Sequence, residues 1–591
     1  MRELLDNYGF VFVGVCIGLS TSLLAGQALR RFYTVHHHTF DLALYTRLAW
    51  GLAHGDGYSS VLDQSFFALH APFVLAPLGL LGRLFGTVQV LLVTQALCTS
   101  VTALPIYRLG VLWKSSGLGV AGALAYLLYP NLSHVACYEF HPGNLALPAI
   151  AYGLLALAQG RVRMLWLCCL TMVLCRADFA LVTLMLGLLA MIEVPALRRT
   201  GGKMMVASVV AFGGSLALNG MFAHGTTSAD LHFGPWGGQP FGILFKLFSE
   251  PALVVSHLSA LQRLTYVPRI LAPLLFLPML APRFLLPALP FVAINLISVF
   301  PTATQMYSHY LTPAVPTLVV AAMAGTGRMS MRLQQALPFA LLLAGAVAEI
   351  AWGGTPWSLL YQAQDYRTDS STSARIAVLA AIPAHASVQA PDPLLPHLAE
   401  RPLVFRAPPP DRATRFVVLD ISHRKRFVGT DTLLRTQEEP LVRYWLSRSD
   451  YGLALAVGNY LVFERGRDPR AGISARHFLL PMLAAGEGKR LSACLELMGG
   501  QRTERGVDLT LRALGSCPSD LALHFSTHEG FSRVDLLFEG LLSPAHLRRN
   551  DFIRSQHDLP ISIRLRDLHV GLLRSSGARP EPGDPHAVPI D

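Results

Sequence analysis

The chain carries little charge for its length. Of its 591 residues only 14% are Asp, Glu, Lys or Arg, and 52% are hydrophobic, whereas soluble globular chains carry roughly 25% charged residues. The deficit is local, because long apolar runs fill residues 10 to 352 and then stop. This excludes a wholly soluble protein and predicts a polytopic membrane protein with a soluble C-terminal part.

Several motifs that carry well-known chemistry are missing. The sequence has no glycine-rich phosphate loop, no dinucleotide-binding fingerprint, no Cys-x-x-Cys pair and no His-Glu-x-x-His pair. Nucleotide-driven chemistry and zincin-type proteolysis therefore have no support. The net charge of +11 does not indicate nucleic acid as a partner, because the basic residues mostly flank apolar spans and no aromatic-and-basic binding module is present.

Hydropathy divides residues 1–352 into about eleven predicted spans. The first, Gly9–Leu29, is long enough to cross a hydrocarbon core of ~30 Å, and no cleavage site of small residues follows it, so we expect it to be retained. Pro72–Phe85 is short and interrupted by proline, which predicts an interfacial or re-entrant helix. The other candidates are Val88–Leu109, Leu118–Tyr129, Leu145–Ala158, two arms within Met164–Glu193, Met204–Phe222, Ile270–Leu280, Phe284–Val299, Leu311–Ala324 and Ala336–Trp352.

Basic residues in short connections predict the orientation. They occur at 108 and 114, 161 and 163, 198 to 203, 283, and 328 to 332, and such loops face the cytoplasm. The loops at 130–143, 223–268 and 300–310 then fall outside. For inner and outer loops to alternate in this way, Met164–Glu193, which has basic residues on both flanks, must cross the membrane twice.

Two charged residues, Arg176 and Asp178, lie in the middle of Met164–Glu193. A charge at the centre of a membrane costs ~2.5–3.5 kcal/mol on the insertion scale. We therefore interpret the stretch as a hairpin whose apex faces a watery outer cavity. A single tilted helix with an intramembrane Arg–Asp pair is the alternative, and in either case the two residues are functional candidates.

Titratable side chains gather in the loop after the first span. Val35–Ala71 holds the consecutive histidines 36–38 and, further along, Asp41 and His70. Trp and Tyr rings between them are of the kind favoured at a membrane interface. Three consecutive residues do not easily converge on one ion, so we assign no metal ligands and leave a divalent metal cofactor open. We place chemistry in this loop, and an ordinary solvated loop is the alternative.

The second outer loop carries a Glu–His pair among aromatic residues. Glu139 and His141 are two residues apart and Pro142 follows. The pair is suited to a metal, a phosphate-bearing head group or proton transfer, although a satisfied pair within a loop is the commoner explanation. On the predicted topology this pair shares the outer face with Asp41, His70, Arg176 and Asp178.

Seven stretches carry a resemblance to a known family. Among them are FDLALYTRLAWGLAHGDGY from Phe40, YLLYPNLSHVACYEFHPGNLALP around Glu139, LCRADFAL around Arg176 and SHYLTPAVPTLVVAAM from Ser308. From about Phe40 to Gly466 the chain resembles the uncharacterised bacterial and archaeal membrane family called domain of unknown function 2079, or DUF2079. That family is similar to the GT-C class of membrane glycosyltransferases.

The resemblance to the GT-C class implies a layout and a reaction. Those proteins have a first span, a long outer loop with an acidic residue just after it, further spans, and a soluble domain outside. The loop acid acts as general base or positions the acceptor, and the donor is usually a polyprenyl-phosphate sugar. The matching position in this sequence is Asp41.

The sequence departs from the DUF2079 pattern at two motifs. The family's second outer loop usually reads Asp-Phe-His-Pro followed by an acid, whereas here Glu139 begins the motif and Gly143 ends it. The family's hairpin usually carries Lys-Glu-Asp, whereas here it reads Arg176-Ala177-Asp178. One carboxylate is missing from each motif, which puts a two-acid metal site in doubt, while Arg176 keeps a charge suited to bidentate phosphate recognition.

The composition changes after Trp352. Residues 353–466 predict a small α/β domain, and alternation at period two over 467–578 predicts a β-sandwich. The Pro- and Gly-rich residues 579–591 predict a disordered tail. Cys494 and Cys517 fall on neighbouring predicted strands, and an oxidising outer compartment would permit a disulfide, but the sequence leaves the pairing open.

We therefore predict a polytopic α-helical membrane protein of GT-C-like fold in a bacterial inner membrane. Its membrane domain covers residues 1–352, with an outer loop at 30–86, and both C-terminal domains lie outside the cytoplasm. It would move a sugar from a polyprenyl-phosphate donor, held with membrane lipid, to a glycan or lipid acceptor of the cell envelope. Asp41 would be catalytic. The residues expected to bind substrate are His70, Glu139, His141, Arg176 and Asp178.

Two other classes of function remain as alternatives. The first is a transporter or flippase-like protein, in which the Arg–Asp pair within the membrane gates a polar path. The second is a structural envelope protein whose outer β-sandwich binds a partner.

Overall fold

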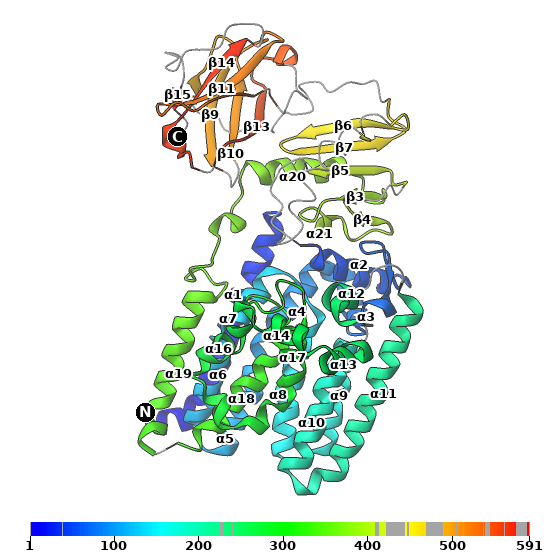
Figure 1. The fold of residues 1–591 in the computed structure, drawn as a ribbon, viewed down its shortest axis with the longest axis vertical. Helices are drawn as coiled ribbons and strands as arrows, with labels where there is room; N and C mark the ends of the chain where they lie inside the picture. The colour runs from blue at the N-terminus through cyan, green and yellow to red at the C-terminus, as the bar shows by residue number, and fades with distance from the viewer. Residues whose placement is uncertain are drawn as a thin grey trace. The chain divides into compact units, whose positions relative to one another are not determined.

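A computed structural model describes most of the chain, and it divides into two compact units, Met1–Arg367 and Thr368–Asp591 (Figure 1). Each unit is described by itself. His38 and most of the predicted tail 579–591 lie outside the described residues. The described residues are 2–37, 39–223, 228–238, 240–329, 331–407, 413–420, 444–445, 448–468, 488–502, 506–535, 537, 544–560, 562–574 and 588–589.

The first unit is helical apart from one short hairpin, β1 (Tyr58–Ser59) with β2 (Gln64–Ser65). Its larger helices are α1 (Arg2–Tyr33), α2 (Asp41–Ala53), α3 (Leu75–Phe85), α4 (Thr87–Val101), α5 (Ala103–Trp113), α6 (Ser116–Leu127), α7 (Pro130–Tyr138), α8 (Leu147–Ala158), α9 (Val162–Cys175), α10 (Ala180–Glu193), α11 (Arg198–Phe222), α13 (Pro240–Ser249), α14 (Pro251–Leu258), α17 (Leu289–Ile297), α18 (Val315–Thr326) and α19 (Met331–Trp352). Shorter helices are α12 (Ser228–Phe233), α15 (Leu261–Leu264) and α16 (Tyr266–Leu271).

Within the described residues, three helices are long and apolar enough to cross a membrane: Asn7–Tyr33, Thr87–Trp113 and Pro195–Phe222. A fourth is added if the bent pair Ala229–Ser249 and Pro251–Leu258 is counted as one span. Most of the other predicted spans form apolar helices of 10–17 residues. The membrane character of the unit is thus plain, while the number of eleven crossings stays a prediction.

Proline explains the segment that departs most from the predicted spans. Ile270–Leu280 and Phe284–Val299 were each predicted as one span, but the chain there forms α16, the short turns η6 (Ala272–Leu274), η7 (Leu277–Leu280) and η8 (Pro282–Ala288), and α17. Each turn has proline in its first positions, where the missing N–H prevents a continuing helix. The prediction of a continuous helix was therefore wrong for Ile270–Leu280, whereas Pro282–Ile297 is one apolar helix that begins with the 3-10 turn η8.

The predicted hairpin is present. Helix α9 ends at Cys175, Arg176 has an extended backbone, the turn η3 (Ala177–Phe179) follows, and α10 runs back. The alternative of one tilted helix is wrong, because the extended backbone of Arg176 breaks the helical ladder.

Three contacts show that the first unit has two distinct ends. Ala177 N donates to the carbonyl of His70 at 3.2 Å, and Nδ2 of Asn219, near the end of α11, donates to the carbonyl of Ala68 at 2.7 Å. At the opposite end of α10, Arg283 Nη1 lies 3.3 Å from Glu193 Oε1. The hairpin apex, the first outer loop and the end of α11 therefore share one end, which we call the loop end.

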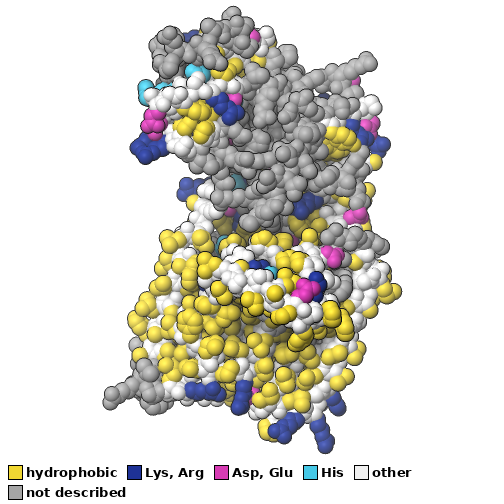
Figure 2. Space-filling model, in the orientation of Figure 1, with side chains coloured by type: hydrophobic (Ala, Val, Ile, Leu, Met, Phe, Trp, Pro, Cys, Tyr) yellow, Lys and Arg dark blue, Asp and Glu magenta, His cyan; other side chains and the backbone are white. Residues whose placement is uncertain are grey.

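The surface of the first unit agrees with this division. On the face shown in Figure 2, hydrophobic side chains cover its middle, and Lys and Arg gather at its lower end. Exposed apolar side chains, as expected of a lipid-facing surface, are clearest on α11, where Val206 and Val210 are 67% and 68% exposed. The exposed basic residues at the predicted basic positions are Arg108, Lys114, Arg161, Arg163, Arg198, Arg199, Lys203, Arg283 and Arg328.

The second unit begins with a mixed sheet. Its strand order is β4-β3-β5-β7-β6, in which β3 is parallel to β4 and β5 and the other pairs are antiparallel. The apolar stretch FVVLD is strand β5 (Phe416–Asp420), and the β6–β7 hairpin turns at Gly458. The remaining elements are α20 (Ser370–Ala381), β3 (Val388–Ala390), α21 (Leu395–Leu398), β4 (Val404–Arg406), β6 (Tyr451–Val457) and β7 (Tyr460–Arg465).

Two four-stranded antiparallel sheets follow, with orders β13-β10-β9-β8 and β12-β11-β14-β15. Leu509 of one sheet and Leu523 of the other are fully buried in the same core, so the two sheets share one interior as the period-two alternation predicts. The strands are β8 (Lys489–Arg490), β9 (Leu495–Arg502), β10 (Gly506–Ala513), β11 (Leu521–Thr527), β12 (Ser532–Asp535), β13 (Phe552–Asp558), β14 (Leu568–Arg574) and β15 (Val588–Pro589).

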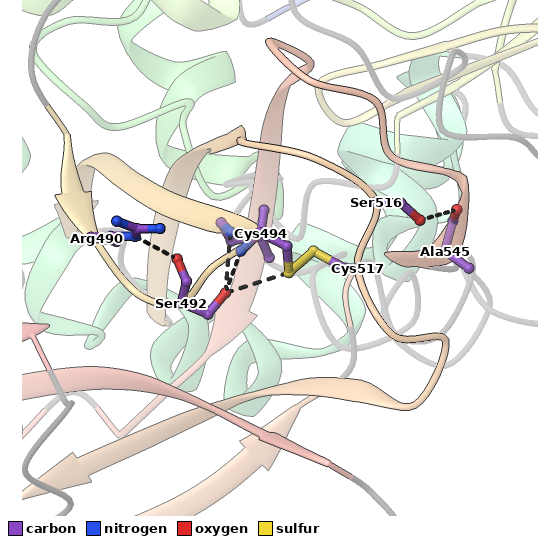
Figure 3. Close-up of a disulfide and its surroundings, with 7 residues drawn as sticks. Arg490, Ser492, Cys494, Ser516, Cys517 and Ala545 are labelled. Carbon is purple, nitrogen blue, oxygen red and sulfur yellow. Dashed lines mark hydrogen bonds between the residues drawn. A yellow bond between two sulfur atoms is a disulfide. The ribbon is translucent and has the colours of Figure 1, made fainter.

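Cys494 and Cys517 form a disulfide in this second unit, with Cα atoms 5.4 Å apart (Figure 3). Cys494 directly precedes β9, and Cys517 lies between β10 and β11, so the bond joins the two sheets where the chain passes from one to the other. Ser492 Oγ accepts a hydrogen bond from the Cys494 N–H at 3.1 Å and fixes the turn before the bond.

Removing the disulfide should destabilise the second unit. The two cysteines are 23 residues apart, and closing a loop of that size in the unfolded chain is worth about 3 kcal/mol in the chain-entropy account. Cys494→Ser in the full chain should lower the urea midpoint for proteolysis of this unit, and Cys494→Ser with Cys517→Ser should lower it no further. Cys16→Ser, in a free cysteine of α1, is the control. A midpoint unaffected by reductant would contradict the prediction.

Candidate functional site

Asp41 is the first residue of α2, and the start of this helix is held by Glu139. The Glu139 side chain is 1% exposed. Its Oε2 accepts a hydrogen bond from Leu42 N at 2.9 Å, and its Oε1 lies 3.4 Å from Nδ1 of His37. A carboxylate at a helix N-terminus satisfies free N–H groups and interacts favourably with the helix dipole. Glu139 thus fixes the backbone that carries Asp41.

The loop that carries Glu139 and His141 is in turn held by Gln95 of α4, which is fully buried. Gln95 Nε2 donates to the Glu139 carbonyl at 2.6 Å. Its Oε1 accepts from His141 N at 2.8 Å and from Asn144 Nδ2 at 3.1 Å. One amide therefore satisfies three groups of a sharply turning loop.

Arg176 and Asp178 form a two-point ion pair at the hairpin apex. Arg176 Nε donates to Asp178 Oδ1 at 2.8 Å, and Nη2 donates to Oδ2. The two side chains are 15% and 19% exposed. A methyl group placed on Gly143 would lie 3.7 Å from Arg176 Nη1, so the apex packs against the loop that Glu139 begins. The two motifs that the sequence separates by more than thirty residues are neighbours in space.

His70 is joined to this apex through the backbone. Its carbonyl accepts from Ala177 N at 3.2 Å, and its φ of +67° lies in the left-handed region. Ala71 follows with φ +42°. Two successive non-glycine residues in this region are uncommon and are held only by surrounding contacts. The hairpin apex thus supports the backbone turn from which the exposed His70 side chain extends.

The loop at 300–310 brings two residues that sequence reasoning missed, His309 and Tyr310. The His309 ring stacks on His141 with centroids 3.6 Å apart and planes at 21°. The ring of Tyr45, on α2, lies 6.2 Å from His141, and the ring of Tyr310 lies 4.0 Å from His309. The only signal in the sequence was their place in the SHYLTP motif, which by itself does not indicate a function.

The imidazoles at this site are held neutral. Burial lowers the pKa of His141 to about 3, and the charge of Arg176 lowers it as well. Burial also places the pKa of His309 well below its usual value, with His141 and Arg176 acting in the same direction. Positive charge at the site therefore belongs to Arg176.

Asp41 and Arg176 both lie within electrostatic reach of Tyr310. Burial raises the pKa of the Tyr310 phenol above its usual value, Asp41 raises it further, and Arg176 lowers it. The structure thus brings together a carboxylate, a guanidinium and neutral hydrogen-bonding rings at the loop end. Of the sequence-predicted residues, Asp41, His70, His141, Arg176 and Asp178 gather here, while the described contacts of Glu139 support the start of α2.

This set of residues is suited to an anion that has hydroxyl groups nearby. A guanidinium binds phosphate oxygens, and a carboxylate accepts a proton from a hydroxyl. Within the described residues, which leave out His38, no group of three or more His, Cys, Asp or Glu side chains is arranged to hold a metal ion. The sequence analysis assigned no metal ligands, and the question of a divalent metal cofactor stays untested.

A cavity of about 430 Å³ borders the same loop. Its lining is mainly aromatic, and it includes Tyr58, Phe66, Phe67, Phe73 and Phe222. Phe66 and Phe67 belong to the short helix η1 (Phe66–Leu69), which His70 directly follows. An apolar cavity therefore adjoins a segment that ends in a site residue.

A model of the family described as a predicted membrane protein, DUF2079, matches residues 31–428, which is more than half of the chain. The chain belongs to the DUF2079 family. The match includes all the residues described above, from Asp41 to Tyr310. No curated protein matches this DUF2079 chain.

Two solved structures are similar to the DUF2079 protein. The crystal structure of ArnT from Cupriavidus metallidurans bound to undecaprenyl phosphate is 13% identical, with a TM-score of 0.44, over 77% of this chain and 98% of that chain. The Archaeoglobus fulgidus oligosaccharyltransferase in complex with Zn and sulfate is 13% identical, with a TM-score of 0.36, over 77% and 73%. Similarity at this level assigns no activity to the DUF2079 protein.

Replacing Gln95 should destabilise the first unit. Gln95→Leu keeps the size of the side chain but leaves the Glu139 carbonyl, the His141 N–H and the Asn144 amide without this partner. Each such loss in a buried site costs about 1–3 kcal/mol, so the thermal unfolding midpoint in detergent should fall clearly. Gln89 lies on the same helix, and among the described residues the hydrogen bond of its side chain is to the exposed Tyr33 hydroxyl, so Gln89→Leu should change the midpoint little. Equal midpoints for both variants would contradict this account of the loop.

Proposed function

We propose that this DUF2079 protein is a GT-C-type membrane glycosyltransferase that moves a sugar from a polyprenyl-phosphate donor to an acceptor hydroxyl at the outer face of a bacterial inner membrane. The observation that carries the proposal is the gathering of Asp41 and Arg176 at one end of an apolar helical unit. A proton acceptor and a phosphate-binding cation are the two groups that such a transfer requires.

The proposed reaction is a displacement at the sugar carbon that is bonded to phosphate. Asp41 takes the proton of the acceptor hydroxyl as the new carbon–oxygen bond forms. The bond between the sugar carbon and the phosphate oxygen breaks, and the negative charge that develops on the polyprenyl phosphate is held by Arg176. His70 and His141 contribute neutral hydrogen bonds, Asp178 orients the guanidinium, and Glu139 holds the helix that carries Asp41.

The aromatic cavity supports a lipid-linked donor. Its walls of Phe66, Phe67 and Phe222 are suited to a branched hydrocarbon chain. The segment η1 links these walls to His70, whose carbonyl is bonded to the apex that carries Arg176. We propose that the first part of the polyprenyl chain lies in the cavity while its phosphate reaches Arg176.

We propose an orientation in which the loop end and the second unit lie outside the cytoplasm, with about eleven crossings. The exposed basic residues at the opposite end of the first unit support it. The disulfide of the second unit supports it as well, because disulfides persist in oxidising compartments.

Reporter fusions test the orientation. A reporter that is active only outside the cytoplasm should be active when fused after Thr355 and silent when fused after Arg199, because Arg199 belongs to the basic end of the unit. A second reporter that is active only in the cytoplasm, fused at the same positions, is the control and should show the reverse. Activity of the first reporter at Arg199 would overturn the orientation and with it the proposed outer site.

Asp41→Asn tests the reaction. The change keeps the size of the side chain but removes its basicity, and general acid–base groups typically contribute ~10²–10⁴-fold to a rate. Mass spectrometry of envelope glycans and glycolipids should show a product that is lost on deletion, restored by the wild-type gene and not restored by Asp41→Asn. Protein level and membrane insertion are measured in parallel.

The matched control for this test is Asp63→Asn. Asp63 is in the same outer loop and has φ +58°, a conformation that asparagine tolerates. The Asp63→Asn variant should therefore restore the product. A deletion that leaves every glycan and glycolipid unchanged would contradict the proposed function, whereas restoration by Asp41→Asn would contradict only the role of Asp41.

A further inference from the structure

A chain of hydrogen bonds leads from the end of α17 to Tyr310. Phe300 N donates to Ser298 Oγ at 3.1 Å. Ser298 Oγ lies 2.8 Å from His232 Nδ1, and His232 Nε2 lies 3.1 Å from the Tyr310 hydroxyl. These contacts join the outer loop to α12, which is far from it in the sequence.

The direction of each bond follows from counting donors and acceptors. Ser298 is 1% exposed, and its oxygen already accepts from Phe300 N, so its own hydrogen needs an acceptor. Among the described contacts of the Ser298 hydroxyl that acceptor is His232 Nδ1. The opposite tautomer would leave a buried hydroxyl hydrogen without a partner, which native structures avoid.

This assignment determines what the tyrosine can do. With Nδ1 accepting from Ser298, the hydrogen of neutral His232 is on Nε2 and is donated to the Tyr310 oxygen. The Tyr310 O–H is then directed elsewhere, and in the part of the chain that the structure describes it has no acceptor. Tyr310 is half-buried and lies within electrostatic reach of Arg176 and Asp41.

We propose that Tyr310 is a phosphate-binding residue, whose hydroxyl donates to an oxygen of the phosphate that Arg176 holds, and that His232 and Ser298 are positioning residues. The inference rests on the proposed function, since it names a further contact to the same anion. A hydrogen bond to a charged phosphate oxygen is stronger than one to a neutral hydroxyl, so the Tyr310 hydroxyl favours a phosphate head group, while Arg176 supplies the charge attraction.

Binding to the purified full-length protein in detergent micelles tests this. The probes are a polyprenyl monophosphate, the matching uncharged polyprenol and inorganic phosphate, each followed by equilibrium titration. Tyr310→Phe should weaken the polyprenyl monophosphate about tenfold, the usual worth of one hydrogen bond to a charged group, and leave polyprenol unchanged. Tyr307→Phe, in the same loop and 40% exposed, is the matched control and should behave as wild type. Inorganic phosphate shows whether the lipid chain is needed for the contact.

Two substitutions at His232 separate positioning from mere support of the fold. The amide of His232→Gln can still reach the Tyr310 oxygen from the Nε2 side and should keep most of the affinity. The amide of His232→Asn can reach only Ser298, so this variant should bind polyprenyl monophosphate several-fold more weakly. In the Tyr310→Phe background, His232→Asn should cause no further loss of affinity. Equal losses for both amides would contradict the positioning role.

The outcomes distinguish this inference from the function on which it rests. Unchanged affinity in Tyr310→Phe, with binding abolished by Arg176→Gln, would overturn the inference and leave the proposed site standing. If the wild-type protein does not distinguish polyprenyl monophosphate from polyprenol, the proposed lipid-phosphate donor is wrong and the inference falls with it.

Discussion

The loop end of the first unit depends on one buried carboxylate, that of Glu139. A buried charge is tolerated only when its oxygens are hydrogen-bonded, and Glu139 meets this requirement through Leu42 N and the nearby ring of His37. Its own carbonyl is bound by Gln95 of α4. The first outer loop, the second outer loop and a membrane helix are therefore fixed to one another at a single residue, and Asp41 stands where this junction puts it.

Physical reasoning from the sequence identified the residues whose charge is energetically unfavourable within a membrane span. Arg176 and Asp178 were identified because charge in an apolar stretch needs a reason, and the parity of basic loops then placed them beside His70 and His141. Tyr310 and His232 could not be found this way. A tyrosine or histidine in a loop carries no free-energy penalty that would mark it in the sequence. Its role arises only from contacts such as that with Ser298. Gln95 was missed because one amide in an apolar helix resembles any helix–helix contact.

The second unit shows the same limit in another form. Alternation at period two predicted the sandwich strands because one face of each strand must be buried. It did not decide whether Cys494 and Cys517 pair, since that depends on the path between β10 and β11 and not on the alternation. Likewise the prolines after Tyr266 were visible in the sequence, yet only the structure shows that they divide Ile270–Leu280 into short turns.

The short arms of the α9–α10 hairpin have a consequence for the lipid around them. Each arm has 14 residues, which span ~21 Å, whereas a hydrocarbon core measures ~30 Å. A bilayer accommodates short hydrophobic segments by thinning locally, at a cost of fractions of a kcal/mol per ångström of mismatch. In the proposed orientation, a bilayer that thins around these arms would bring the phosphates of its outer leaflet closer to the level of Arg176.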